Sequence, residues 1–174
     1  ILPGKPHFAA ANYTEIKKYL FFGITALVSL VVLAGHINAI TPRVTRLDLK
    51  IAKKAGSMKT LHIAAASDIH MGTLVGPRRT AQLVRMLNER KADIILLAGD
   101  IVDEDLAPVI RYDLGRSLLK LQAPLGVYAI TGNHEYIGGA EAAVKYLGEH
   151  GVKMLRDTAV LVNESFYLAG RNDR

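Results

Sequence analysis

The chain has 174 residues, which is enough for one domain with a hydrophobic core. It contains no cysteine, so disulfide bonds and thiolate metal sites are excluded, and any metal must be held by His, Asp, Glu or Asn. The net charge of +6 is unevenly placed, because residues 1–59 carry +7 and residues 60–174 carry −1. The nearly neutral second part argues against nucleic acid as a partner, and the basic first part points to a membrane lipid bilayer.

An uncharged, mainly apolar segment occupies residues 20–41, after an N-terminal flank of residues 1–19. We predict a transmembrane helix here, because a spanning helix needs about 20 apolar residues and apolar residues occupy every helical face. A buried core helix and a signal peptide are the alternatives. The 19 preceding residues are long for the basic region of a signal peptide, and no A-x-A cleavage site follows.

Basic residues are more frequent after the apolar segment than before it. Residues 42–59 carry six of them, and we interpret this range as a basic juxtamembrane linker with an edge strand over residues 44–51. By the positive-inside rule, the domain that follows is predicted to be cytoplasmic, behind a single or last transmembrane helix in the cell membrane.

From residue 60 onward, short apolar segments alternate with amphipathic ones, which predicts an α/β domain with a parallel sheet. Strands are expected at residues 61–67, 93–98, 126–131 and 153–155, the first two fully buried. Helices are expected at residues 77–90, 106–121 and 139–150. A hairpin is expected from residues 159–162 and 166–169.

Three of these strands end in polar residues that can bind metal ions. The sets are Ser67-Asp68-Ile69-His70, Gly99-Asp100-Ile101-Val102-Asp103 and Gly132-Asn133-His134-Glu135. They are spaced by one β-α unit each, and ligands gather outside the carboxyl ends of strands in an open α/β sheet. We therefore expect the three sets to converge at one edge.

The local patterns support this convergence. Asp68 and His70 lie two residues apart on a segment expected to be extended, so both can turn toward one point. Gly99 and Gly132 allow tight turns close to the site.

Each motif alone has an ordinary structural explanation, because an Asp after a strand usually caps a helix or forms a turn. Together they predict a metal site, and carboxylate, imidazole and amide ligands suit Mn, Fe, Zn or Mg. A carboxylate between two cations can bridge them, and Asp100 is placed for that. The loop at residues 71–76 lacks the Gly-Lys-Ser/Thr ending of a nucleotide-binding loop.

With these motifs in this order, residues 60–174 resemble the calcineurin-like metallophosphoesterase superfamily, and especially its bacterial membrane-linked members. The resemblance implies a four-layer α/β/β/α sandwich. It also implies that Asp68 and His70 bind one metal ion, that Asp100 bridges two ions, that Asn133 binds the second and that His134 acts on the phosphate.

The resemblance assigns supporting roles to two further acids. Asp103 would orient the ligands, and Glu135 would be a turn residue or would support the ligands from behind. The family pattern continues with a lone His and a Gly-His-x-His motif, but no histidine follows His150. The chain begins at Ile1 rather than Met, and we expect a C-terminally truncated metallophosphoesterase domain that is weakly active or inactive alone.

The function that follows is metal-dependent hydrolysis of a phosphate ester, either a phosphodiester or a pyrophosphate, with lipid-linked substrates favoured by the membrane helix. Two divalent metal ions would lower the pKa of a water molecule and neutralise charge, and His134 would give general-acid or electrostatic help. The alternative is a catalytically inactive, membrane-tethered binding scaffold of the same fold. Histidines downstream of the chain would favour the enzyme.

Overall fold

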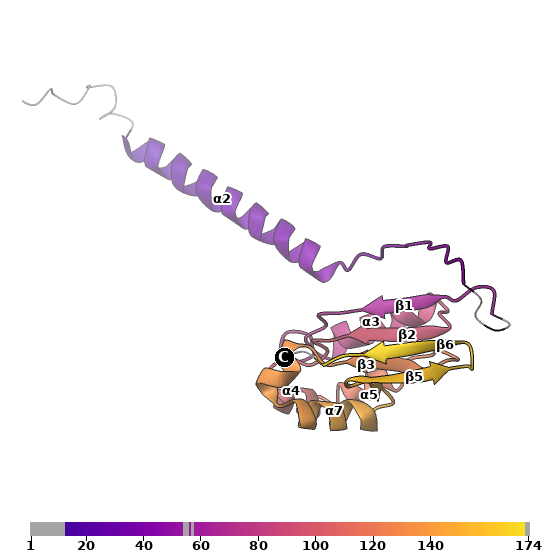
Figure 1. Ribbon diagram of the computed structural model, residues 1–174. Coiled ribbons are helices and arrows are strands. Elements are labelled where there is room, and N and C mark those ends of the chain that lie inside the picture. The colour runs from indigo at the N-terminus through magenta and orange to yellow at the C-terminus, as the bar shows by residue number, and fades with distance from the viewer. Residues whose placement is uncertain (1–12, 54–55, 57, 173–174) are drawn as a thin grey trace, which may run out of the picture. The chain divides into compact units, whose positions relative to one another are not determined.

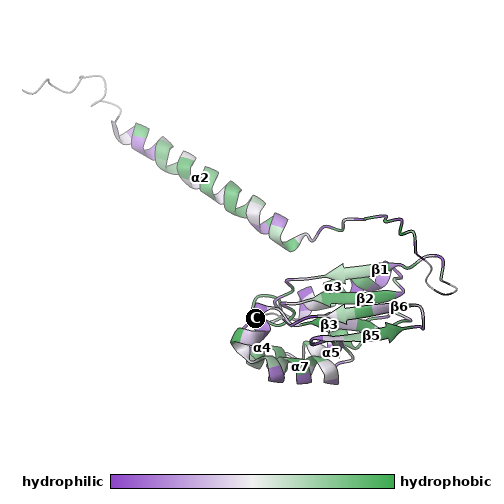
Figure 2. Ribbon diagram, in the orientation of Figure 1, coloured by the Kyte–Doolittle hydropathy of each residue, from purple (hydrophilic) through white to green (hydrophobic). Residues whose placement is uncertain are grey.

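The computed structural model describes residues 13–53, 56 and 58–172, and the chain divides after Ile51 into two units (Figure 1). The first unit contains α2 (Tyr13–Ile40), which is long and apolar enough to cross a membrane (Figure 2). None of its residues is buried. It begins earlier than the predicted segment, with Glu15 in its first turn paired to Lys18 at 2.9 Å.

The predicted edge strand over residues 44–51 is wrong. This segment has no regular secondary structure, and it forms no ladder with another strand in the part of the chain that the structure describes. Its apolar residues alternate only in part, and a strand without a partner leaves its backbone groups to water.

The second unit is built on a four-stranded parallel sheet in the order β1-β2-β3-β4. The strands are β1 (Ile63–Ala66), β2 (Ile94–Ala98), β3 (Val127–Ile130) and β4 (Lys153–Met154). The helices between them are α3 (Pro77–Glu89), α4 (Leu106–Arg111), α5 (Gly115–Leu118), α6 (Asn133–Gly138) and α7 (Ala140–Glu149). Because all strands run the same way, their carboxyl ends meet at one edge. The predicted α/β fold is confirmed.

The two faces of the sheet carry separate hydrophobic cores. Ile95 and Leu97 of β2 lie in the core that includes Leu87 of α3 and Leu147 of α7. On the other face, a second core joins the sheet to a hairpin of β5 (Thr158–Val162) and β6 (Phe166–Gly170), which lies over β3 in Figure 1. The predicted hairpin is therefore present, and it makes a second, two-stranded sheet.

Residues 61–67 do not form the fully buried strand that we predicted. β1 is shorter, lies at the edge of the sheet and buries only Ala64, while Ile63 is 53% exposed. A run of apolar residues predicts that a strand is present, but its burial depends on which neighbours the sheet places beside it.

The single helix expected at residues 106–121 is also wrong, because the chain forms α4 and α5 with a break at Asp113, whose φ is +50°. Val109 is buried and Ile110 is exposed. The break brings Gly115 against the ring of His150, where a Cβ atom on residue 115 would lie 2.5 Å from the ring. Close packing of α5 on α7 thus replaces the regular helix.

Candidate metal centre

The loops that follow β1 and β2 run side by side beyond the sheet. The backbone N–H of Asp68 donates to the carbonyl of Gly99 at 3.3 Å, and that of His70 donates to the carbonyl of Asp100 at 2.9 Å. The φ angles of Asp68 and His70 are +53° and +50°, so the predicted extended conformation is wrong. Ile69 lies between these two left-handed residues, and its buried side chain anchors the loop.

The end of β2 is held closely against the end of β3. Asp100 has a φ of +49°, and its Oδ1 accepts the backbone N–H of His134 at 2.9 Å. Gly132 is required by space rather than by its backbone angles, because a Cβ atom there would lie 2.6 Å from the backbone nitrogen of Asp100. Gly99 has a φ of +84°, which favours glycine directly.

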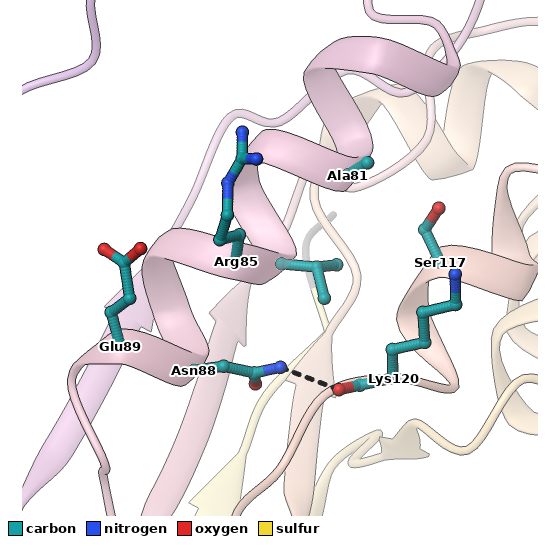
Figure 3. Close-up of a pocket in the computed structure, with 7 residues that line it drawn as sticks. Ala81, Arg85, Asn88, Glu89, Ser117 and Lys120 are labelled. Carbon is teal, nitrogen blue, oxygen red and sulfur yellow. Dashed lines mark hydrogen bonds between the residues drawn. The ribbon is translucent and has the colours of Figure 1, made fainter.

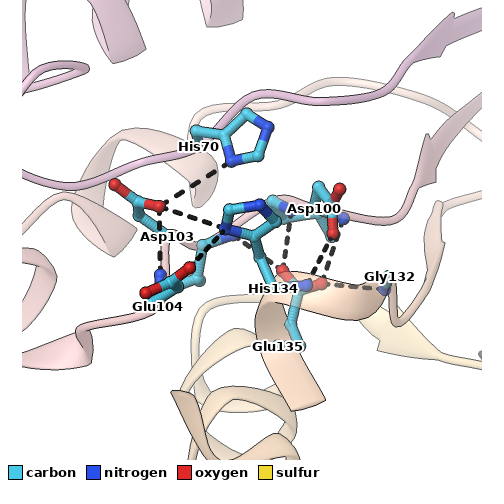
Figure 4. Close-up of polar contacts among 9 residues, drawn as sticks. His70, Asp100, Asp103, Glu104, Gly132, His134 and Glu135 are labelled. Atoms are coloured by element: carbon cyan, nitrogen blue, oxygen red, sulfur yellow. Dashed lines mark hydrogen bonds and ion pairs between the residues drawn. The ribbon is translucent and has the colours of Figure 1, made fainter. Parts of the chain in front are cut away.

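Two groups of side chains bring potential ligand atoms within 4.8 Å of one another, and His70 belongs to both. The groups are Asp68, His70 and Asp100, and His70, Asp103 and His134. Figure 4 shows His70, Asp103 and His134 close together, the first two from loops and His134 from the first turn of α6. All of these side chains are exposed or half-buried, and their carboxylate and imidazole donors fit a divalent metal ion.

Asp103 approaches both imidazole rings. Its Oδ1 is 3.2 Å from Nδ1 of His134 and 3.9 Å from Nδ1 of His70. The two rings meet edge to face with their centroids 4.4 Å apart. Glu104 also approaches, with Oε1 4.0 Å from Nδ1 of His134. We did not predict Glu104, and its place directly after Asp103 was the only signal in the sequence.

The remaining predicted residues lie in the first turn of α6. Asn133 is exposed and directly precedes His134, at the end of β3. Glu135 points the other way into the protein, where it is 1% exposed. The sequence indicated a supporting role for Glu135, but its burial was not foreseen.

A surface hollow lies elsewhere on the second unit. It has a volume of about 480 Å³ and lies between α3 and α5, with the Asn88 side chain donating to the carbonyl of Lys120 at 2.8 Å (Figure 3). None of the predicted site residues lines it. We therefore define the candidate metal centre by its converging ligand atoms.

Comparison with known proteins identifies the family of this chain. The family model described as "Calcineurin-like phosphoesterase" matches residues 61–173. An uncharacterized metallophosphoesterase of Aquifex aeolicus is 31% identical over 139 residues, covering 80% of this chain and 52% of that protein. A Bos taurus "transmembrane protein with metallophosphoesterase domain" is 37% identical over 65% of this chain and 24% of its own length.

A third relative, from Chlamydia muridarum, is named UDP-2,3-diacylglucosamine pyrophosphatase. It is 25% identical over 86% of this chain, which covers 48% of that protein. The chain thus spans about half or less of the length of these relatives. The family match covers all three motifs and the strands that carry them. The chain belongs to the calcineurin-like phosphoesterase family.

Proposed function

We propose that the protein hydrolyses a phosphate ester, either a phosphodiester or a pyrophosphate, at a dinuclear metal centre close to a membrane. The observation that carries this proposal is the convergence of Asp68, His70 and Asp100, whose potential ligand atoms lie within 4.8 Å of one another, beside the ring of His134. Two divalent cations bound there would lower the pKa of a water molecule and neutralise the charge of the reacting phosphate.

We propose the following roles for the site residues. Asp68 and His70 would hold one metal ion and Asn133 the second, and Asp100 would contribute its carboxylate to both. His134 faces the phosphate, where it donates a hydrogen bond or protonates the leaving oxygen. The carboxylate of Asp103, 3.2 Å from Nδ1 of His134, orients that ring.

We propose a lipid-linked pyrophosphate or phosphodiester as the substrate class. Two features support it: the candidate membrane helix α2, and a relative whose name describes a pyrophosphatase acting on a diacylated sugar nucleotide. In this arrangement, residues 20–41 anchor the protein, residues 42–59 form a basic linker at the membrane surface, and residues 60–174 belong to the catalytic domain on the cytoplasmic side.

The test uses the chain together with any flanking sequence that its gene encodes, purified in detergent. Bound metal and manganese-dependent hydrolysis of bis-p-nitrophenyl phosphate are measured for the wild type, for Asp100→Asn and for Asp113→Asn. Asp113 is exposed and lies outside the metal centre, so its variant is a matched control for the loss of a carboxylate.

Turnover with about two metal ions per chain, lost in Asp100→Asn and kept in Asp113→Asn, is the expected result. A protein that neither binds metal nor turns over the ester would contradict the proposal and favour the membrane-tethered scaffold. A lipid-linked pyrophosphate offered beside the soluble diester then tests the substrate class.

A further inference from the structure

The Glu135 carboxylate accepts four backbone hydrogen bonds inside the protein. Oε1 accepts the N–H groups of Ile101 and Val102, both at 2.7 Å. Oε2 accepts the N–H of Asp100 at 3.0 Å and that of Gly132 at 2.8 Å. Figure 4 draws hydrogen bonds of this carboxylate as dashed lines, including the one to Gly132. Four charge-assisted bonds offset the cost of burying the charge.

An ordinary helix-capping role explains only one of these bonds. Glu135 is the third residue of α6, and a glutamate there commonly accepts the N–H of the residue before the helix, which is Gly132 here. The other three donors belong to residues 100–102, which follow β2 and are distant in the sequence. The carboxylate therefore joins the ends of β2 and β3.

The backbone held by this carboxylate includes Asp100, a ligand of the proposed metal centre. Asp100 is kept in the left-handed region by its neighbours, and its Oδ1 in turn accepts the N–H of His134 at 2.9 Å. A non-glycine residue takes this conformation only where the surrounding bonds determine it. Loss of the bonds at residues 100–102 would free the backbone of Asp100 and shift its side chain relative to His70 and His134.

We propose that Glu135 is the positioning residue of the metal centre, and that it sets the distance between the second and third motifs before any metal is bound. This proposal rests on the proposed function only in its statement that the placed side chains bind metal. Glu135 is too deeply buried to contact the substrate, and it acts through Asp100 and His134.

Four backbone donors at one side chain require a carboxylate, and an amide of the same shape cannot replace it. A glutamine has one acceptor oxygen and one NH2 group, so in either orientation its NH2 would face two backbone N–H groups. Glu135→Gln therefore breaks two bonds and adds two repulsive contacts while conserving shape. Glu135→Asp keeps the charge on a side chain that is shorter by one methylene, and it should recover part of the function that Glu135→Gln loses.

The experiment compares the wild type, Glu135→Gln, Glu135→Asp and Glu149→Gln, each with its native flanking sequence. Glu149 is exposed near the end of α7, outside the site, so it controls for the loss of a negative charge. Hydrogen–deuterium exchange is measured on the metal-free proteins for peptides covering residues 99–104 and α7. Mn²⁺ affinity is measured by calorimetry.

We expect Glu135→Gln to speed exchange at residues 100–102 about ten-fold while α7 is unchanged. Its Kd for Mn²⁺ should rise about 10–100-fold, with a smaller rise for Glu135→Asp and none for Glu149→Gln. Equal acceleration throughout the domain, or a Kd for Mn²⁺ unchanged in Glu135→Gln, would overturn the proposal.

If Glu135→Gln does not fold, Glu135→Asp is judged by the same two criteria. If neither variant folds, Glu135 serves the fold and not the placement of the ligands, and the proposal is wrong. A wild type that binds no Mn²⁺ would defeat the proposed function, whereas the exchange data on metal-free protein would still decide whether Glu135 holds residues 100–102.

Discussion

Asp103 places one carboxylate oxygen 3.2 Å from Nδ1 of His134, so an acid from the loop after β2 contacts an imidazole from the first turn of α6. This contact determines which ring nitrogen of His134 faces the site. With Nδ1 directed at Asp103, Nε2 is the nitrogen left for the substrate.

Asp103→Asn tests this contact, because it keeps the size of the side chain and removes its charge. We expect kcat for the diester to fall about 10–100-fold while bound metal stays near the wild-type value. Asp113→Asn serves as the control. Loss of metal in Asp103→Asn would instead make Asp103 a ligand, and an unchanged kcat would remove it from the mechanism.

Metal binding should stabilise the folded domain. A ligand at 100 times its Kd adds about 2.7 kcal/mol to the free energy of unfolding. Mn²⁺ should therefore raise the melting temperature of the wild type by several degrees, and a chelator should reverse the rise. His70→Ala should abolish the response because His70 belongs to both ligand groups, whereas the exposed His62→Ala should keep it. An equal rise in both variants would place the ion elsewhere.

The close approach of β2 and β3 predicts opposite effects for two glycine substitutions. Gly132→Ala would push a Cβ atom against the backbone of Asp100, and should cost about 1–3 kcal/mol of unfolding free energy and weaken metal binding. Gly148→Ala, in α7 with no atom within 4 Å of the added Cβ, should stabilise by about 0.5–1 kcal/mol. Chemical denaturation measures both, and equal effects would contradict the packing described.

Tyr146 connects α7 to the break between α4 and α5. Its hydroxyl accepts the N–H of Gly115 at 2.9 Å, and burial raises its pKa above the ordinary value for tyrosine. Tyr146→Phe leaves that N–H without its acceptor, which should cost about 1–3 kcal/mol, whereas the exposed Tyr167→Phe should cost little.

The same tyrosine predicts a pH dependence. Because the folded state favours the neutral phenol, its contribution is complete below the unfolded pKa of about 10 and is lost as pH rises through the higher folded pKa. The free energy of unfolding should therefore fall more steeply above about pH 10 in the wild type than in Tyr146→Phe. Parallel curves for the two proteins would show that Tyr146 does not titrate between the two states.

The orientation of the domain can be tested by labelling, since the chain has no cysteine of its own. Glu149→Cys places a thiol at an exposed position near the end of α7. In a background without other cysteines, a membrane-impermeant maleimide should label it only after the cells are permeabilised, as expected for a cytoplasmic domain. Labelling in intact cells would reverse the proposed topology.

The fold was predictable from the sequence where local pattern and tertiary context agree. β2 is central and buried on both faces, so its apolar run was a sufficient signal. β1 has a similar apolar run but lies at an edge of the sheet. The break at Asp113 arises from the packing of Gly115 on His150, a contact between residues far apart in the chain. Single-sequence patterns do not encode such contacts.

The candidate site, like the fold, was predictable from the sequence only in part. The positions of Asp68, Asp100 and His134 at the ends of three strands predicted that they converge, because topology alone brings strand ends together. The left-handed backbone of Asp68 and Asp100 and the burial of Glu135 depend on hydrogen bonds between loops, which no local pattern reveals.

The left-handed conformation of Asp68, His70 and Asp100 limits how this centre can change. Apart from glycine, the side chains most readily accommodated at such φ angles are Asn, Asp and His, and two of these supply the carboxylate and imidazole donors used here. A glutamate at position 100 would offer the same carboxylate to a metal ion, but the backbone would resist it. The residue types that can replace these ligands, in evolution or by design, are therefore limited by the backbone conformation as well as by the metal ion.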